Sequence, residues 1–258
     1  MEKEYLFHYT NLQSLALILQ SKTFKFNSLM NVDDMEEMIC QDIIYGGKYC
    51  FVSSWTEDEE ESIPMWNLYS KLNGIRIKLK KNPFIRYSWN DPLCPDQKIE
   101  SFFSLDQINR YDIFPYFPSD GEILYKVIYT NEKDKLYPKL KKDVAYGYHI
   151  DYERLGKYKR SLWEFQKEWR YILYIRPVKL SAYMESLDYG KQNYKYSITN
   201  NVDLPMSEIF LSIDQDCFNN IEIMCGPKMS KGEKILLECL MDKYCPSGTI
   251  KDSHLKLQ

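Results

Sequence analysis

The chain of 258 residues is 44% hydrophobic and 15% aromatic, and it is long enough to bury a substantial core. Its net charge of -3 gives no overall electrostatic reason to expect a nucleic-acid-binding protein. The start, Met1-Glu2-Lys3-Glu4, lacks the features of a secretory signal, and no apolar run reaches the ~18 residues of a membrane span. Seven cysteines without a C-x-x-C pair fit reduced thiols. We expect a cytoplasmic protein with no membrane partner.

The first third of the chain alternates between short strands and short helices. Residues 5–9 alternate as a strand, and Asn11 is placed to cap a helix that continues to about residue 20. The acidic stretch 31–37 suits the start of another helix, because carboxylates stabilise helix N-termini. A strand at 49–55, a helix at 64–69 and a strand at 75–79 are expected next.

The remainder of the chain is expected to be mostly strands. Residues 82–122 hold five of the eleven prolines, and we interpret them as an irregular insertion. The other expected elements are strands at 123–129, 167–175, 209–213 and 221–224, and helices at 146–163 and 230–241. This order predicts a single α+β domain over residues 1–258, built around antiparallel sheet. The absence of repeated βαβ units and of G-x-G-x-x-G argues against a Rossmann fold.

Short motifs resemble the ADP-ribosyltransferase superfamily, whose members split NAD between nicotinamide and ribose. The first is His8-Tyr9-Thr10, which is similar to the histidine strand of the diphtheria-toxin-like branch. In that branch the histidine binds a ribose hydroxyl of NAD, and the resemblance gives this role to His8. A neutral imidazole can donate and accept hydrogen bonds at once, which suits a diol. The alternative is that His8 is an ordinary half-buried strand residue.

The second motif is Phe51-Val52-Ser53-Ser54-Trp55, which resembles the second strand of the superfamily. In the toxin branch, aromatic rings eleven positions apart sandwich the nicotinamide. Trp55 and Trp66 are eleven apart here, and Tyr69 follows one helical turn later, although the family usually has tyrosines at these positions. The alternative is that these rings only pack a helix on a strand. The expected NAD-binding residues are His8, Tyr9, Thr10, Ser53, Ser54, Trp55, Trp66 and Tyr69.

The third motif is Lys167-Glu168-Trp169-Arg170, where Glu168 resembles the catalytic glutamate of the superfamily. Such a carboxylate would bind the 2'-hydroxyl of the ribose and stabilise the oxocarbenium-like cation formed as nicotinamide leaves. Glu168 and Arg170 share one face of a strand, so the alternative is a structural ion pair between Glu168 and Arg170 or a neighbouring lysine.

The whole chain also resembles a large bacterial family of unknown activity that combines these motifs with an Asn/Asp/Glu loop and a Met-Trp helix. The resemblances imply split antiparallel sheets with flanking helices. They also imply that NAD is the substrate and that the acceptor is a nucleic acid or a protein. A toxin or phage-defence effector, held in check by an inhibitory antitoxin protein, is the implied role.

Two other classes of function are open at this stage. Asp33, Asp34, Glu36 and Glu57 could hold magnesium in a metal-dependent nuclease. The aromatic cleft could also belong to a non-catalytic module that binds a nucleotide or a protein. We expect no metal in the leading hypothesis, because NAD ionises with electrostatic help alone. Whether ADP-ribose passes to a macromolecule or to water is open as well.

Overall fold

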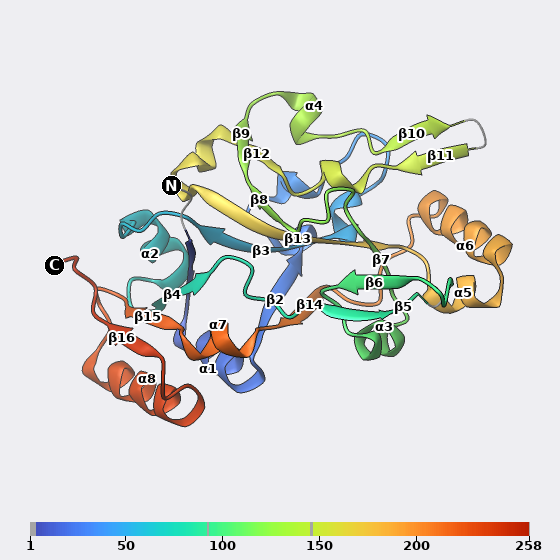
Figure 1. The fold of residues 1–258 in the computed structure, drawn as a ribbon. Helices are drawn as coiled ribbons and strands as arrows, with labels where there is room; N and C mark the ends of the chain where they lie inside the picture. The colour runs from blue at the N-terminus through green and yellow to red at the C-terminus, as the bar shows by residue number, and fades with distance from the viewer. Residues whose placement is uncertain (1–3, 92, 145–146, 258) are drawn as a thin grey trace.

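The computed structural model describes residues 4–91, 93–144 and 147–257 and has an α+β fold (Figure 1). Ten strands of the described residues form one sheet, whose main path runs β14-β2-β3-β1-β4-β15-β16. These strands are β1 (Tyr5–Thr10), β2 (Thr23–Ser28), β3 (Cys50–Thr56), β4 (Ile75–Lys80), β14 (Glu208–Ser212), β15 (Glu222–Cys225) and β16 (Thr249–Lys251). The long strand β13 (Glu168–Arg176) pairs with β3, and β7 (Phe114–Tyr116) and β8 (Leu124–Lys126) pair with β13.

Smaller ladders and short helices surround this sheet. The ladders join β5 (Tyr87–Asn90) to β6 (Lys98–Ser101), β10 (Lys141–Val144) to β11 (Gly147–Ile150), and β9 (Ile128–Thr130) to β12 (Tyr158–Arg160). The helices are α1 (Leu12–Ser21), α2 (Ile63–Ser70), α3 (Leu105–Tyr111), α4 (Lys133–Leu136), α5 (Leu180–Glu185), α6 (Leu187–Thr199), α7 (Gln215–Asn219) and α8 (Lys231–Tyr244). Short 3-10 helices cover Leu29–Asn31, Met35–Met38, Gly46–Tyr49, Tyr152–Arg154 and Ser161–Gln166.

The expected helix starts are confirmed where a side chain caps the backbone. Asn11 Oδ1 accepts a hydrogen bond from the Ser14 amide at 2.8 Å and begins α1. Ser230 and Glu233 form a reciprocal capping box at the start of α8. These two helices lie side by side next to the sheet (Figure 1). They bury leucines such as Leu15 and Leu237 in the main hydrophobic core, which positions the N-terminal strand β1.

Strand β13 buries both of its faces, which explains its nearly continuous apolar sequence. Tyr171 and Leu173 join the core that contains α1 and α8, whereas Ile172 and Tyr174 join a second cluster on the opposite face. Side chains alternate along a strand. Glu168 and Arg170 therefore belong to the face of Ile172 and Tyr174.

Two strands share one edge of β3 and leave its middle open. Strand β13 pairs with β3 along its whole length, from Cys50 to Thr56, and so occupies the other edge. On the shared edge, β2 pairs only with Phe51 and Val52, and β1 pairs only with Thr56. The segment 53–55 has no strand partner there among the described residues. A split of this kind exposes backbone groups and side chains in the interior of a sheet.

Two sequence-based expectations differ from the structure. The range 82–122 is not wholly irregular, because it contains β5, β6, α3 and β7. The helix expected at 146–163 is wrong for the residues described. They form β11, the 3-10 helix Tyr152–Arg154, β12 and the start of another 3-10 helix, while Tyr146 lies outside the described residues. Aromatic residues are at least as typical of strands as of helices, so their density there was a poor guide.

Candidate functional site

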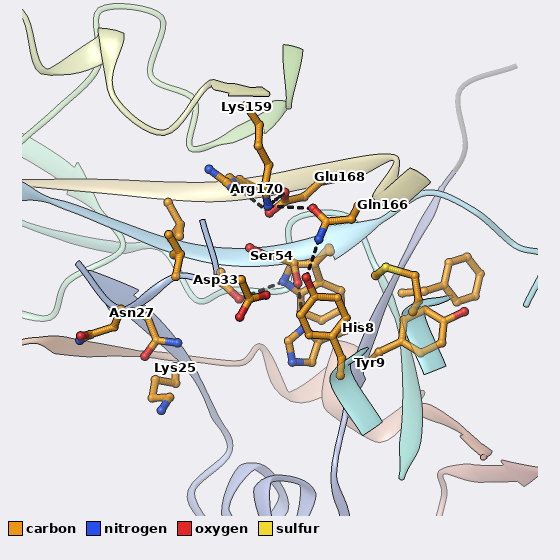
Figure 2. A pocket seen from close by; sticks show the side chains of 18 residues that line it. His8, Tyr9, Lys25, Asn27, Asp33, Ser54, Lys159, Gln166, Glu168 and Arg170 are labelled. Carbon is orange, nitrogen blue, oxygen red and sulfur yellow. Dashed lines mark hydrogen bonds and ion pairs between the residues drawn. The ribbon is translucent and has the colours of Figure 1, made fainter. Parts of the chain in front are cut away.

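A cleft of about 240 Å³ opens at the split edge of β3 (Figure 2). We use "the cleft" for the cavity between β1 and β2, with β3 and β13 as its floor. The residues that line it are Phe7, His8, Tyr9, Lys25, Asn27, Asn31, Val32, Asp33, Val52, Ser53, Ser54, Trp55, Met65, Tyr69, Lys159, Gln166, Glu168 and Arg170. They come from segments that are far apart in sequence, so the cleft exists only in the folded chain.

His8 forms one wall of the cleft and is fixed by the open backbone of β3. Its Nδ1 lies 2.8 Å from the carbonyl oxygen of Ser54. A carbonyl can only accept, so Nδ1 carries the hydrogen and the neutral ring presents Nε2 as an acceptor. Burial lowers the pKa of His8 below its usual 6.5, and the hydrogen bond to Ser54 opposes that shift only in part. His8 is therefore neutral near pH 7.

Glu168 and Arg170 form a bidentate ion pair on the floor of the cleft. Arg170 Nε donates to Glu168 Oε1 at 2.6 Å, and Arg170 Nη2 donates to Glu168 Oε2 at 3.1 Å. Both side chains are almost fully buried. The alternation of β13 places them on one face, and Arg170 lies opposite Ser54 in the register with β3. The ion pair expected as the alternative role of Glu168 is thus present, and it lies inside the cleft.

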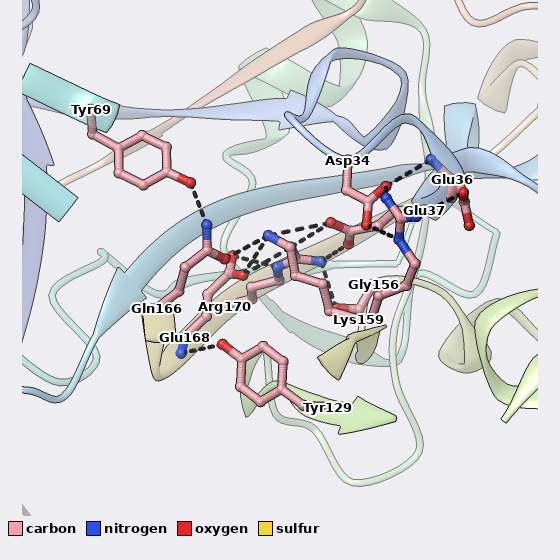
Figure 3. Close-up of polar contacts among 11 residues, drawn as sticks. Asp34, Glu36, Glu37, Tyr69, Tyr129, Gly156, Lys159, Gln166, Glu168 and Arg170 are labelled. Atoms are coloured by element: carbon pink, nitrogen blue, oxygen red, sulfur yellow. Dashed lines mark hydrogen bonds and ion pairs between the residues drawn. The ribbon is translucent and has the colours of Figure 1, made fainter. Parts of the chain in front are cut away.

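Two further side chains complete a buried network of four charges (Figure 3). Glu37 binds the neighbouring edge of the Arg170 guanidinium, where Nη1 donates to Glu37 Oε2 and Nη2, which Glu168 shares, donates to Glu37 Oε1 at 3.0 Å. Lys159 Nζ lies 3.0 Å from Glu168 Oε2 and 3.5 Å from Glu37 Oε1. Two carboxylates and two cations leave the cluster with no net charge. Buried charges persist only when they are paired in this way.

The network keeps Glu168 ionised. Burial by itself would raise its pKa, but the charges of Arg170 and Lys159 outweigh burial, and the pKa falls from 4.5 to about 2. The Ser54 hydroxyl acts in the same direction. For Arg170, burial opposes the charged form, yet Glu168 and Glu37 raise its pKa well above the usual value. The floor of the cleft therefore presents a permanent carboxylate.

A chain of hydrogen bonds leads from this network across the cleft (Figure 3). Lys159 Nζ donates to Gln166 Oε1 at 2.7 Å, and Gln166 Nε2 donates to the hydroxyl of Tyr69. Tyr69 lies on α2 and is half-buried. Its pKa is raised by burial and by the nearby carboxylate of Asp33. Lys159 and Gln166 are thereby held in fixed positions between Glu168 and Tyr69.

Most of the predicted site residues meet in the cleft. His8, Tyr9, Ser53, Ser54, Trp55, Tyr69 and Glu168 all line it. Thr10 and Trp66 do not. Thr10 is the last residue of β1 and is paired with Ile75 of β4, away from the split.

The prediction that Trp55 and Trp66 face each other across the cleft is therefore wrong. Trp66 is fully buried, packs edge-on against Tyr9 with ring centroids 4.8 Å apart, and donates from Nε1 to Glu61 at 2.9 Å. On α2, Met65 and Tyr69 are four residues apart and share the face that lines the cleft. Trp66 lies about 100° from Met65 around the helix axis and is buried in a small hydrophobic cluster with Tyr9, Met65 and Met224.

Several residues of the cleft were not predicted from the sequence. Lys159, Gln166 and Arg170 were not proposed as site residues, and neither were Lys25, Asn27 and Asn31, while Asp33 was considered only as a magnesium ligand. One signal was available for Arg170, because a Glu and an Arg two apart on a strand point the same way. No local pattern identified Lys159, which is almost fully buried.

The acidic residues considered as magnesium ligands are mostly neutralised by basic side chains. Asp34 is held by Arg160 through two hydrogen bonds of 2.8 and 3.0 Å, and Arg160 also binds Glu36 at 2.9 Å. Glu57 pairs with Lys126. No group of three or more His, Cys, Asp or Glu positioned for a metal ion occurs in the described part of the chain. This arrangement does not favour the nuclease hypothesis.

Comparisons with protein-family models, with curated proteins and with solved structures found no match. Within the residues that the structure describes, none of the helices combines the length and apolar character needed to cross a membrane. The function must therefore be inferred from the chemistry of the cleft.

Proposed function

We propose that this protein splits NAD between nicotinamide and ribose and transfers ADP-ribose to a macromolecular acceptor, either nucleic acid or protein. One observation carries the proposal. A neutral His8 and an ionised Glu168 line one cleft, at the point where β1 and β2 share an edge of β3. Hydrogen bonding to a sugar diol and stabilisation of a developing positive charge are the two tasks that this reaction sets.

Glu168 retains the capacity to act on a substrate despite its ion pairs. Its two oxygens accept three hydrogen bonds from Arg170 and Lys159 and one from the Ser54 hydroxyl. A carboxylate offers about four acceptor positions, so a ribose hydroxyl would take the position that the neutral Ser54 hydroxyl occupies. As the bond to nicotinamide breaks, the ribose gains positive charge, and a fixed carboxylate beside it lowers the barrier. The loss of this charge should slow the reaction by roughly 100- to 1,000-fold.

The aromatic lining of the cleft supports the binding of a pyridinium ring. Trp55, Tyr9 and Tyr69 all contribute surface to the cleft. The electron-rich face of such a ring attracts a cation, and the nicotinamide of NAD is cationic before cleavage. The cleft volume of about 240 Å³ is slightly below the usual range for small-molecule sites, about 300–1,000 Å³. It suits the reacting nicotinamide-ribose half of NAD, with the remainder lying outside.

The shared motifs support the same proposal. The order of the His8, Ser53-Ser54-Trp55 and Glu168 motifs along the chain resembles that of the ADP-ribosyltransferase superfamily, and these residues line one cleft. We extend the proposal to the split-sheet fold of that superfamily. The same resemblance supports a toxin or defence effector restrained by an antitoxin protein.

The test is the release of nicotinamide from NAD by the purified protein. Wild type is compared with Glu168→Gln, with and without added RNA, DNA and lysate protein. Glu164→Gln is the matched control, because Glu164 is exposed, four residues earlier, and outside the cleft. We expect release by wild type and Glu164→Gln and its loss in Glu168→Gln. The addition that speeds release identifies the acceptor class.

Because Glu168→Gln changes a buried network, its folding is checked by circular dichroism and its NAD binding by calorimetry. NAD binding by wild type without any release would instead support the non-catalytic binding module. If wild type neither binds NAD nor releases nicotinamide under any of these conditions, the proposal is wrong.

A further inference from the structure

We propose that Asp33 is the general base that accepts the proton of the attacking nucleophile in the transfer reaction, an inference that rests on the proposed function. Any acceptor with an O–H or N–H group must lose a proton as it bonds to the ribose. A second carboxylate in the cleft, distinct from Glu168, is suited to that task. Asp33 lines the same cleft and lies at its exposed side.

The adjacent residues Asp33 and Asp34 have opposite environments. Asp34 is buried, and both of its oxygens are held by Arg160. Asp33 is exposed and its carboxylate points into the cleft (Figure 2). Within the described residues, Asp33 has no ion pair with a lysine or arginine, whereas Glu168 pairs with two cations. Asp33 is therefore accessible to an acceptor and is not neutralised by a neighbour.

Glu168 is poorly suited to act as the base itself. Three hydrogen bonds from cations hold its oxygens, and its pKa is about 2. A general base works best when its affinity for protons approaches the working pH. The two carboxylates thus divide the work, with Glu168 stabilising positive charge and Asp33 accepting the proton.

The hydrogen-bond chain from Lys159 orients Asp33. Gln166 donates to the oxygen of Tyr69, so the hydroxyl hydrogen of Tyr69 is free to be donated elsewhere. Asp33 is close enough to this hydroxyl to raise the pKa of Tyr69. The chain then ends at Asp33, with the Tyr69 hydroxyl as its last donor. Tyr69 holds the Asp33 carboxylate at the cleft while leaving its other oxygen available for the acceptor.

The step balances without any further reactant. The nucleophile oxygen or nitrogen forms a bond to C1' of the ribose, and the bond from C1' to the nicotinamide nitrogen breaks with its electron pair. Nicotinamide leaves as a neutral molecule. The proton of the nucleophile passes to Asp33 and then to solvent. Water in the place of the acceptor follows the same course and gives free ADP-ribose.

Azide provides a direct test, because it is a nucleophile with no proton to lose. Nicotinamide release from NAD is measured for wild type, Asp33→Asn and Glu168→Gln, in buffer with water as acceptor and in buffer with excess sodium azide. Asp188→Asn is the matched control, because Asp188 is exposed on α6 and does not line the cleft. We expect Asp33→Asn to lose about 100- to 10,000-fold with water and to recover wild-type release with azide.

Glu168→Gln should remain slow with azide, since charge stabilisation is still missing. Two results would overturn the assignment of Asp33: wild-type release by Asp33→Asn with water, or a slow Asp33→Asn that azide does not restore. Absence of release by wild type with water, with azide and with added RNA, DNA and lysate protein would instead contradict the proposed function. The two failures are therefore distinguishable in one experiment.

Discussion

Arg170 lies between Glu37 and Glu168, and it binds the side chains of both although Glu37 is 133 residues away in the sequence. Replacing Arg170 by Met should leave two buried carboxylates facing each other with only Lys159 between them. Breaking a buried ion pair from one side destabilises a protein by about 3–5 kcal/mol. We expect a loss of that size in the free energy of unfolding, measured by urea denaturation.

The control for this prediction is Arg110→Met. Arg110 pairs with Asp106 on the surface of α3, where the two side chains are 65% and 74% exposed. Exposed pairs contribute about 0–1 kcal/mol. Similar losses for the two variants would show that the buried network does not stabilise the fold.

The pH dependence of stability should reflect the low pKa of Glu168. Its pKa is 4.5 as a free side chain and about 2 in the folded protein. A lowered pKa means that the unfolded chain binds the proton more readily, so the contribution of Glu168 is fully present above pH 4.5. It is lost as the pH falls from 4.5 to about 2. Acid titration of the unfolding free energy should therefore be shallower for Glu168→Gln than for Glu164→Gln over this range.

His8 should contribute to NAD binding through its polar atoms rather than its ring area. His8→Phe retains packing against Trp55, whose ring centroid is 5.1 Å away, but removes the bond to Ser54 and the acceptor Nε2. The loss of one hydrogen bond corresponds to roughly a tenfold weaker affinity. Calorimetric titration with NAD measures it. His254→Phe on the surface should bind like wild type, and equal affinities for both variants would contradict the role of His8.

Substitution of the two aromatic residues of α2 should separate core packing from the cleft. Trp66→Ala removes a fully buried ring, and we expect a loss of about 3–5 kcal/mol in stability with little change in the NAD affinity of the folded protein. Tyr69→Phe removes the acceptor for Gln166 and should change stability by only ~0.5–1.5 kcal/mol. If Trp66 did contact nicotinamide, its loss would weaken NAD binding in protein that is still folded.

Much of the fold follows from local signals in the sequence. The cap at Asn11, the capping box at Ser230, and the apolar run of β13 each identify their element, because the interactions that define them are local. The helices α5 and α6 had no assignment from the sequence. Gly190 lies within α6 and packs on the ring of Tyr183 in α5, a tertiary contact that no single-segment pattern contains.

The site was predictable only in part, for a related reason. His8, Ser54 and Glu168 belong to recognisable strand motifs, and a split sheet edge brings them together. Glu37 pairs with Arg170, which lies 133 residues later in the chain. Lys159 belongs to β12 and pairs with Glu168 of β13. Charged residues in acidic or basic stretches are usually solvated, so composition alone places both at the surface.

The separation of the network along the chain has a consequence during synthesis. Strand β13, which supplies Glu168 and Arg170, is made long after β1 and the segment that carries Glu37. A chain still emerging from the ribosome therefore contains His8 of β1 before Glu168 of β13 has been made. Contacts between such distant segments form late in folding. Under the proposed function, the nascent chain would therefore be inactive until β13 has left the ribosomal tunnel.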